Sequence, residues 1–210
     1  MLSYTVLPPG ALTLLHQLMQ ADVLAQARLV GGTALALQYG HRLSVDLDFF
    51  GQIPDEGEKL RVILRQCGEV RVIKESPHIK TYIARGIKVD FVDYDPRYLW
   101  VDEPIVEDGI RLASDKDIAA MKVLAIHGRG SKKDFIDLYF ILQHYTMAEV
   151  LDFYRAKYPD HSDFAALRSL AYFDDAEAQS PPRMLIPATW EEMKSHILRA
   201  VADYKGHEFR

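Results

Sequence analysis

Cysteine is almost absent from this chain of 210 residues: Cys67 is the only one, so no internal disulfide can form. Long apolar runs are also absent, since no window is long enough to span a bilayer. The first ten residues lack the basic segment and apolar core of a secretory signal. We therefore expect a cytoplasmic protein without a membrane partner, in which the thiol of Cys67 fills the core.

Several kinds of site are excluded in the same way. None of the eight histidines has a short metal-ligand spacing, and none accompanies Cys67 or a serine in a nucleophile motif. A P-loop and a dinucleotide-binding signature are missing, because Gly31 and Gly32 are not followed by the required glycines or lysine. The net charge of −5 argues against indiscriminate coating of nucleic acid, although a local basic strip is compatible with it.

The chain has enough apolar residues for a full core, with 49% hydrophobic content. Alternating and helical patterns interleave in the first half. They predict helices from residue 11 to about 27, at 33–39 and at 58–67, and strands at 28–30, 44–50, 69–74, 80–85 and 87–94. We predict an α+β fold, with a mixed β-sheet core at residues 1–112 and a helical region at residues 113–210 that packs on the core.

The second half reads as one helix after another. Three capping boxes mark helix starts: Ser114 with Asp117, Ser131 with Asp134, and Thr189 with Glu192. We expect the first helix to end near Gly128, with a linker at residues 128–133, and the last helix to run from Trp190 to about Tyr204. The apolar faces of the first two helices are predicted to consist of Ile118, Met121, Leu124 and Ala125, and of Phe135, Leu138, Tyr139 and Leu142.

Gly31 and Gly32 stand between a predicted strand and a predicted helix. Such a turn exposes backbone N–H groups at the positive end of the helix dipole, where a triphosphate can bind. The hydroxyl of Thr33 is a further donor. Taken alone, the glycine pair favours an ordinary strand-to-helix turn, and the pair of acids that follows in the sequence reverses this preference.

Asp46 and Asp48 follow in the predicted strand at residues 44–50. Because they alternate with Val45, Leu47 and Phe49, both carboxylates are expected on one face, with Cα atoms roughly 6.6 Å apart. Aspartate is a poor strand former, so the simple alternative of two acids on a wet sheet edge requires a reason. A divalent cation, Mg²⁺ or Mn²⁺, removes their repulsion and bridges to substrate phosphates.

A third acid can complete such a site and draw a proton from an attacking hydroxyl. Asp90, in the predicted strand at residues 87–94, is the candidate. Asp93 and Asp95 fall on the opposite face. The alternative interpretation is that Asp90 faces solvent and pairs with Lys88 or Arg85, an interaction of little energetic value.

Charged residues of the second half supply further candidates. Lys122 lies at the edge of an apolar helix face, where it either reaches inward to a triphosphate or extends to solvent. Asp134 and Asp137 share a helix face, but Asp134 also fits the capping box begun by Ser131, so Asp137 is the better functional candidate. Arg129 either contacts phosphates or belongs to a solvated loop.

Four blocks of the sequence resemble the AbiEii/AbiGii-type nucleotidyltransferase toxins of the DNA polymerase β-like superfamily. They are VGGT at 30–33, RLSVDLDFF at 42–50, DIAAMKVLA at 117–125, and Arg129 with KDFIDL at 133–138. The resemblance implies a nucleotidyltransferase-type sheet, phosphate contacts by Gly32 and Thr33, a metal at Asp46 and Asp48, nucleotide contacts by Lys122 together with Arg42, and a supporting role for Asp137. Asp90 as third metal ligand, and Gly31 and Arg129 as further nucleotide contacts, are predicted from their positions in the sequence. The motif here is Gly-Gly-Thr where the family has Gly-Ser, which removes a serine hydroxyl from the phosphate turn but keeps the backbone donors, so we expect activity to be retained.

The resemblance also implies a reaction. It is the metal-dependent transfer of a nucleoside monophosphate from an NTP to an acceptor such as a tRNA 3′ end or another RNA, with pyrophosphate leaving. The protein would be the toxin of a toxin–antitoxin or phage-defence system with a cognate antitoxin. Two alternatives remain: transfer to a protein or to a small molecule such as an aminoglycoside, and a noncatalytic module that binds nucleotide or antitoxin. All motif acids and lysines are present, which favours catalysis.

Overall fold

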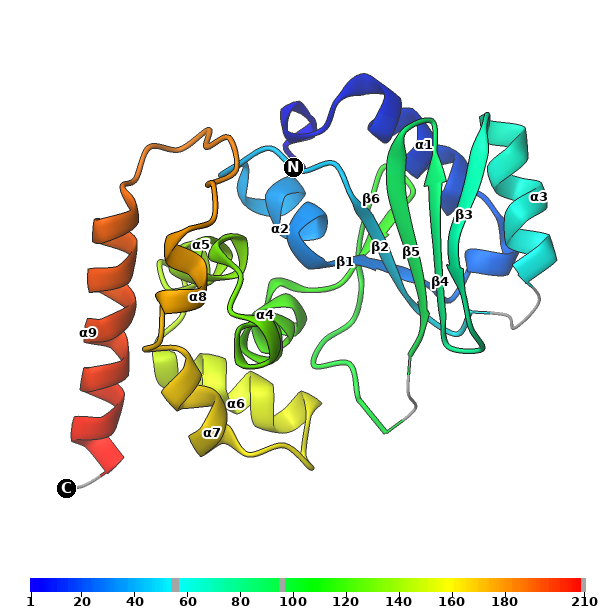
Figure 1. Cartoon of the computed structure of the whole chain (residues 1–210). Helices are drawn as coiled ribbons and strands as arrows, with labels where there is room; N and C mark the ends of the chain where they lie inside the picture. Colours follow the sequence, from blue (N-terminus) through cyan, green and yellow to red (C-terminus); the bar gives the residue numbers. More distant parts are fainter. Residues whose placement is uncertain (54–56, 95–96, 209–210) are drawn as a thin grey trace. The chain divides into compact units, whose positions relative to one another are not determined.

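The computed structural model describes residues 1–53, 57–94 and 97–208 (Figure 1). The chain forms two compact units. The first comprises residues 1–97 and 103–113, and the second comprises residues 98–102 and 114–210. No described helix is long and apolar enough to cross a membrane.

The first unit is built on a mixed sheet with the strand order β3-β4-β5-β2-β1-β7-β6. Its strands are β1 (Arg28–Val30), β2 (Leu47–Gly51), β3 (Val70–Glu75), β4 (Ile79–Ala84), β5 (Ile87–Asp93), β6 (Ile105–Glu107) and β7 (Ile110–Leu112). The helices are α1 (Pro9–Met19), α2 (Gly31–Tyr39) and α3 (Gly57–Cys67), with short 3₁₀ turns at Tyr4–Val6 and Asp22–Leu24. The helix α3 packs on β3 and β4, and α1 packs against α3 and β7 (Figure 1).

Aromatic packing fixes the register in the middle of this sheet. The parallel strands β2 and β5 pair Leu47 with Val89 and Phe49 with Phe91, and all four side chains are fully buried. The rings of Phe49 and Phe91 stack with their centroids 5.4 Å apart. Since side chains alternate across a strand, the residues between these four must point to the opposite face. That face carries Asp48 of β2 and Asp90 of β5.

Most of the expected elements of the first unit are confirmed, including the strands at the glycine turn and the three strands β3, β4 and β5. Gly40 ends α2 in the left-handed conformation, with φ 67°, as predicted. The first helix was expected to reach about residue 27, but it ends at Met19, and a 3₁₀ turn at Asp22–Leu24 leads to β1. The hairpin of β6 and β7 was not predicted, although Asp108 and Gly109 form its turn at positive φ.

The second unit is helical, which confirms the α+β class. It contains α4 (Asp115–Arg129), α5 (Lys132–Ile141), α6 (Met147–Lys157), α7 (Asp163–Ser169), α8 (Asp174–Glu177) and α9 (Trp190–Glu208). The helix α4 contacts α5, α6 and α7, and α9 contacts α5 and α6. The predicted linker at 128–133 is present but shorter, because α4 continues to Arg129 and α5 begins at Lys132. The last helix was expected to end near Tyr204 but continues to Glu208.

The three predicted helix starts differ in detail. Thr189 and Glu192 form the full reciprocal box, with backbone N–H donors 2.7 and 3.2 Å from the side-chain acceptors. The hydroxyl of Ser114 accepts from the backbone N–H of Asp117 at 3.0 Å. The predicted capping box at Ser131 is wrong. The Ser131 hydroxyl donates to the side-chain oxygen of Gln179 at 3.2 Å and does not cap α5. Asp134 is therefore not held by a capping box.

The predicted apolar face of α4 is rotated from the observed one. Met121, Leu124 and Ala125 are only half-buried, whereas the fully covered residues are Ile118, Ala119, Ala120 and Val123 together with Lys122. Lys122 is buried through ion pairs, which no hydropathy pattern represents. The helix consequently turns its lysine inward.

A buried ion pair ties residues 98–102 to the helices. Lys157 lies 2.6 Å from Asp117, and both side chains are inaccessible to solvent. The Lys157 ammonium lies 4.2 Å from the centre of the Trp100 ring and donates to the carbonyl of Leu99 at 3.2 Å. The backbone N–H of Val101 donates to Asp117 at 2.9 Å. These contacts explain why residues 98–102 belong to the second unit, although the residues before and after them in the sequence belong to the first unit.

Candidate active site

The turn between β1 and α2 brings backbone and carboxylate together. Gly31 has φ +69°, a conformation that favours glycine, and a Cβ atom there would lie only 2.8 Å from Oδ2 of Asp48. Gly31 and Gly32 form the first turn of α2, whose N-terminal N–H groups have no intrahelical acceptor. The N-terminus of a helix, the kind of position where an anion can bind, therefore lies next to an acid.

Thr33 positions the segment that leads to the acids. Its side chain is buried, and its hydroxyl donates to the carbonyl of Asp46. Because a hydroxyl has one proton, the 2.8 Å contact with Ser44 is a bond that Ser44 donates. In this structure, the Thr33 hydroxyl holds residues 44–46 in place, and only its backbone N–H remains as a phosphate donor.

Asp46 does not lie in the strand. The predicted strand at residues 44–50 begins instead at Leu47, and Val45, expected on the core face, is 49% exposed. The hydrogen bond from Thr33 takes up the Asp46 carbonyl, so this residue does not join the strand ladder. The expectation that alternation alone places Asp46 beside Asp48 is wrong, although both side chains are half-buried.

Asp48 and Asp90 are brought together by strand pairing. They are direct partners in the parallel pair of β2 and β5, and Asp48 also pairs with Val30 just before the glycine turn. Directly opposite residues share a face of the sheet. The structure therefore places the two acids side by side beside Gly31.

Asp90 is held by one neighbour and has one free oxygen. Its Oδ2 accepts from the ammonium of Lys88, whereas Oδ1 is buried and has no hydrogen-bond donor among the described residues. A buried carboxylate oxygen without a donor is costly, and a cation is the partner that would satisfy it. The alternative that Asp90 pairs with Lys88 is thus correct for one oxygen, but the side chain is only 17% exposed.

The donor set fits a divalent metal, since carboxylate oxygens are the ligands that Mg²⁺ prefers. In the described ranges, no group of three or more His, Cys, Asp or Glu side chains is arranged to hold a metal ion. Asp93 lies on the other side, where its Oδ1 accepts from the backbone of Ile53 at 3.3 Å. Asp95 lies outside the described residues.

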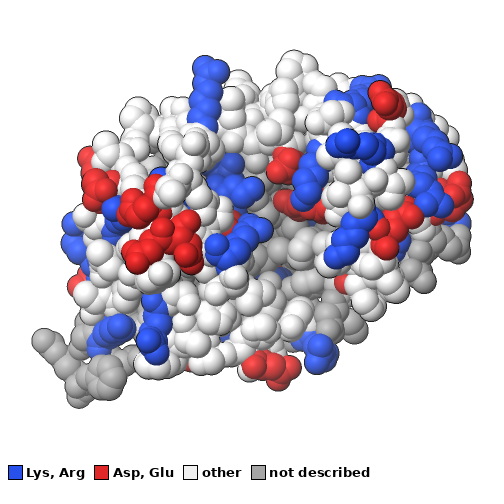
Figure 2. Space-filling model, viewed as in Figure 1, with Lys and Arg blue, Asp and Glu red and all other residues white. Residues whose placement is uncertain are grey.

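Lys88 is predicted from the sequence only as a possible ion-pair partner of Asp90, and not as part of the site. Partial burial lowers the pKa of the Lys88 ammonium, but the hydrogen bond and charge of Asp90 and the charges of Asp48 and Asp46 outweigh this effect and raise the pKa overall. All three candidate acids thus act on one lysine. Figure 2 shows basic and acidic side chains next to one another over the sheet of the first unit. The position of Lys88, two residues before Asp90 on an alternating strand, is the sequence signal for it.

Arg42 is almost completely buried, with 3% of its surface exposed. Its guanidinium donates to the carbonyl of Leu43 at 3.0 Å. It precedes the segment that Thr33 holds, so it belongs to the first unit together with the glycine turn and the three acids.

The remaining candidates form a buried charge cluster in the second unit. The ammonium of Lys122 lies 2.8 Å from Asp134 and 2.6 Å from Asp137, and both acids are inaccessible to solvent. Arg129 adds two hydrogen bonds to Asp134, at 2.8 and 3.1 Å, from a largely exposed side chain. The alternative of a Lys122 that extends to solvent is wrong.

The cluster determines the ionisation of Asp134. Burial alone would raise its pKa, but the charge of Lys122 and the hydrogen bonds from Arg129 hold the pKa below its ordinary value. The sequence favours Asp137 over Asp134 as a functional residue, because it predicts that Asp134 caps the helix. With that role absent, Asp134 is as much a part of the cluster as Asp137.

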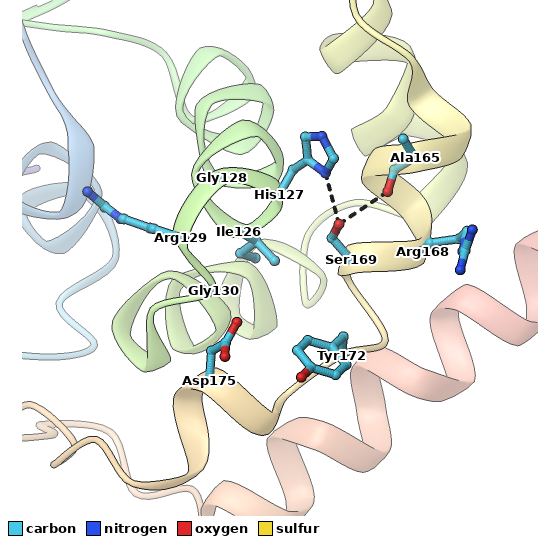
Figure 3. Close-up of a pocket in the computed structure, with 10 residues that line it drawn as sticks. All are labelled: Ile126, His127, Gly128, Arg129, Gly130, Ala165, Arg168, Ser169, Tyr172 and Asp175. Carbon is cyan, nitrogen blue, oxygen red and sulfur yellow. Dashed lines mark hydrogen bonds between the residues drawn. The ribbon is translucent and has the colours of Figure 1, made fainter.

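The second unit also has a cavity of about 440 Å³, which Figure 3 shows beside the end of α4. Here Nδ1 of His127 lies 2.9 Å from the hydroxyl of Ser169, which donates to the carbonyl of Ala165 at 3.2 Å. Because the backbone carbonyl of Ala165 also engages the serine hydroxyl, the pair does not have the arrangement of an activated nucleophile. Arg129 points away from the other lining side chains (Figure 3).

The comparisons with known proteins decide the family. The family model described as nucleotidyl transferase AbiEii toxin, type IV toxin–antitoxin system, matches residues 13–210. The chain belongs to this family. It is therefore an AbiEii nucleotidyltransferase, as the motifs implied. An uncharacterized protein of Aquifex aeolicus (strain VF5) is 36% identical over 182 residues, which cover 84% of this chain and 86% of that protein.

Solved structures share the fold of this AbiEii chain. JHP933 from Helicobacter pylori has 17% identity and a TM-score of 0.53, with 97% of each chain covered. MenT4, a nucleotidyltransferase toxin from Mycobacterium tuberculosis H37Rv, has 14% identity and a TM-score of 0.52, with 90% of this chain and 79% of that chain covered. The antibiotic-resistance factor ANT(2″)-Ia has 18% identity and a TM-score of 0.52, with 69% and 89% covered.

Proposed function

We propose that this AbiEii nucleotidyltransferase transfers a nucleoside monophosphate from an NTP to an RNA 3′ end, for instance that of tRNA. The observation that carries the proposed transfer is the contact of Asp48 with the glycine turn, together with its pairing to Asp90, whereas the RNA acceptor is proposed from the family resemblance. An acid pair beside an anion-binding helix end fits a triphosphate and the cation that accompanies it. Nucleotide binding follows from the same arrangement.

Each candidate site residue of the first unit has a role in this proposal. The N–H groups of Gly31, Gly32 and Thr33 bind phosphate oxygens, and Asp48 and Asp90 hold a divalent cation, for which we propose Mg²⁺. We propose that Asp46 joins this pair when the cation binds, because the three acids are not gathered into a metal site in the structure. Such a cation, when bound, neutralises charge on the phosphates and lowers the pKa of a nearby hydroxyl. Arg42 lends positive charge to the segment before the acids.

The reaction balances as an in-line displacement. The acceptor hydroxyl oxygen forms a bond to the α-phosphorus, the bond from the α-phosphorus to the bridging oxygen breaks, and pyrophosphate leaves. Asp90 takes the hydroxyl proton, because its Oδ1 has no donor among the described residues. Proximity and charge stabilisation supply the rest of the acceleration.

Lys122, Arg129 and Asp137 complete the proposal from the second unit. A lysine held between two buried carboxylates is costly to maintain, and Asp134 of this cluster has a lowered pKa, a feature that is frequent at functional sites. We propose that Lys122 and Arg129 bind the nucleotide, and that Asp137 orients Lys122.

The test incubates the protein with Mg²⁺ and each α-labelled NTP, with and without total tRNA, beside an Asp48→Asn variant and a sample treated with EDTA. Label on tRNA that is lost in the variant and in EDTA is the expected result. Label on the protein itself or on an added aminoglycoside would instead identify a different acceptor. Failure to transfer label to any of them, in protein that binds NTP, would refute catalysis.

The family also implies an antitoxin as a partner. We propose that expression of the chain alone slows bacterial growth, and that the Asp48→Asn variant does not. Growth that is slowed equally by both proteins would show that toxicity does not depend on this site.

A further inference from the structure

Lys88 lies against the acids at the position where a cation is expected. Its ammonium forms an ion pair with Oδ2 of Asp90, and the negative charges of Asp48 and Asp46 act on it as well. Among the described residues, Lys88 is the cationic side chain that is paired with the carboxylate of Asp90. The interaction lies entirely within the first unit.

The strand geometry fixes the face of the sheet from which Lys88 projects. Lys88 and Asp90 flank Val89, which is fully buried and pairs with Leu47 across β2 and β5. Residues two apart on a strand share a face, so Lys88 cannot turn away from the acids without loss of the Val89 packing. The ammonium can still leave Asp90, because the side chain is 44% exposed and has four rotatable bonds.

The ion pair is also incomplete. Lys88 reaches one oxygen of Asp90, and the other is buried without a donor among the described residues. A surface pair kept for stability would not leave a buried oxygen in this state, since the unsatisfied oxygen costs as much as such a pair contributes. The arrangement suits an acid that exchanges one cation for another.

We propose that Lys88 is a tethered counter-ion that competes with the divalent cation for Asp90 and so lowers the affinity of the protein for metal. The inference rests on the proposed function, since it takes the acids as the metal site. When the cation binds, Asp90 exchanges the ammonium for it, and Lys88 is released close to the phosphate turn. The lysine thus neutralises Asp90, and offsets part of the charge of the other two acids, between turnovers.

The experiment measures binding of Mn²⁺ by electron paramagnetic resonance of the free ion, at about 0.1 M salt and without nucleotide. It compares the wild-type protein with Lys88→Met, which keeps the length of the side chain and removes its charge. Lys74→Met is the matched control. Lys74 is exposed on the same face, opposite Thr81, which in turn lies opposite Asp90, so its backbone is roughly 10 Å from Asp90. Salt screens most of its charge at that distance.

Lys88→Met should bind Mn²⁺ about fivefold more tightly than the wild-type protein, because a like charge has been removed beside the metal. Lys74→Met should change the affinity about twofold or less. Lys88→Arg, which keeps the charge, should not tighten binding. Asp90→Asn combined with Lys88→Met should lose the gain.

Three results would overturn the inference. Unchanged or weaker Mn²⁺ binding by Lys88→Met would show that the lysine does not compete. An equal gain in Lys74→Met would reduce the effect to net charge. Absence of Mn²⁺ binding in every protein would refute the inference and the proposed metal site together, whereas binding that is unaffected by Lys88 would leave the proposed function intact.

Discussion

Replacement of Gly31 by alanine tests the contact on which the site is built. The backbone of Gly31 has φ +69°, and an L-residue in this region costs roughly 1–2 kcal/mol. The new Cβ would also lie 2.8 Å from Oδ2 of Asp48, closer than real contacts allow. The carboxylate must therefore rotate away from the glycine turn. Gly31→Ala is expected to lower both stability and transferase activity.

Gly86, in the turn between β4 and β5, separates the two effects. Its φ is +78°, and no atom lies within 4 Å of where its Cβ would be. Gly86→Ala therefore carries the same backbone cost without any contact to an acid. Both variants should lose about 1–2 kcal/mol, measured by urea unfolding, with melting temperatures lower by about 2–4 °C for each kcal/mol.

The assay is NMP transfer at saturating NTP and Mg²⁺, normalised to the folded fraction from circular dichroism. Displacement of a metal ligand by about 1 Å costs on the order of 100-fold in rate. Gly31→Ala should show a loss of that size, whereas Gly86→Ala should match the wild-type protein. Equal normalised activities of the two variants would refute the claim that the close approach of Asp48 to Gly31 forms the site.

Three further predictions concern the second unit. Lys122→Met should lower the free energy of unfolding by about 3–5 kcal/mol, because two buried acids lose their shared cation; a loss below about 1 kcal/mol in urea titrations would contradict this. Burial alone would raise the pKa of Asp134, but Lys122 and Arg129 hold it below 3.8, the ordinary value. The ionised Asp134 therefore stabilises the folded protein above pH 3.8, and this stabilisation disappears as the pH falls through the lower pKa of the folded state. Urea unfolding between about pH 5 and pH 2.5 should therefore show a steeper loss of stability in the wild-type protein than in Asp134→Asn, and parallel curves would refute the sign. Lys157→Met should speed amide hydrogen exchange at residues 98–102, because it leaves Asp117 without its partner; unchanged exchange there would show that the ion pair does not hold the segment.

Most of the first unit could be predicted, since local patterns decide it. Strict alternation identified β3, β4 and β5, and Gly40 marked the end of α2 through its left-handed backbone. The hairpin of β6 and β7 was missed, because its strands have three residues each and too little alternation to recognise, and the Asp108-Gly109 turn was the only available signal. The end of α1 at Met19 was missed for the opposite reason: helix-forming residues continue beyond it, and the 3₁₀ turn that replaces them depends on packing.

The candidate site was less predictable, because its contacts are not local. The carboxylate of Asp48 could be assigned to one face from alternation, but its approach to Gly31 depends on the antiparallel pairing of β1 with β2. Asp46 was expected in the strand, and a hydroxyl thirteen residues earlier in the sequence keeps it out. Lys122 was left ambiguous, since the burial of a lysine depends on acids that reach it from another helix.

The chain crosses between its two units at three places, after residues 97, 102 and 113, because Tyr98–Asp102 is bound into the helices by Asp117 and Lys157. A recombination event at any single position therefore cannot exchange one unit for that of a relative and keep both intact. If the helices from residue 114 onward came from a relative, residues 98–102 would still come from this chain. They would then have to pack on the relative's counterparts of Asp117 and Lys157. The two units must accordingly change together, and a relative that differs at Lys157 should differ at Asp117 or in residues 98–102 as well.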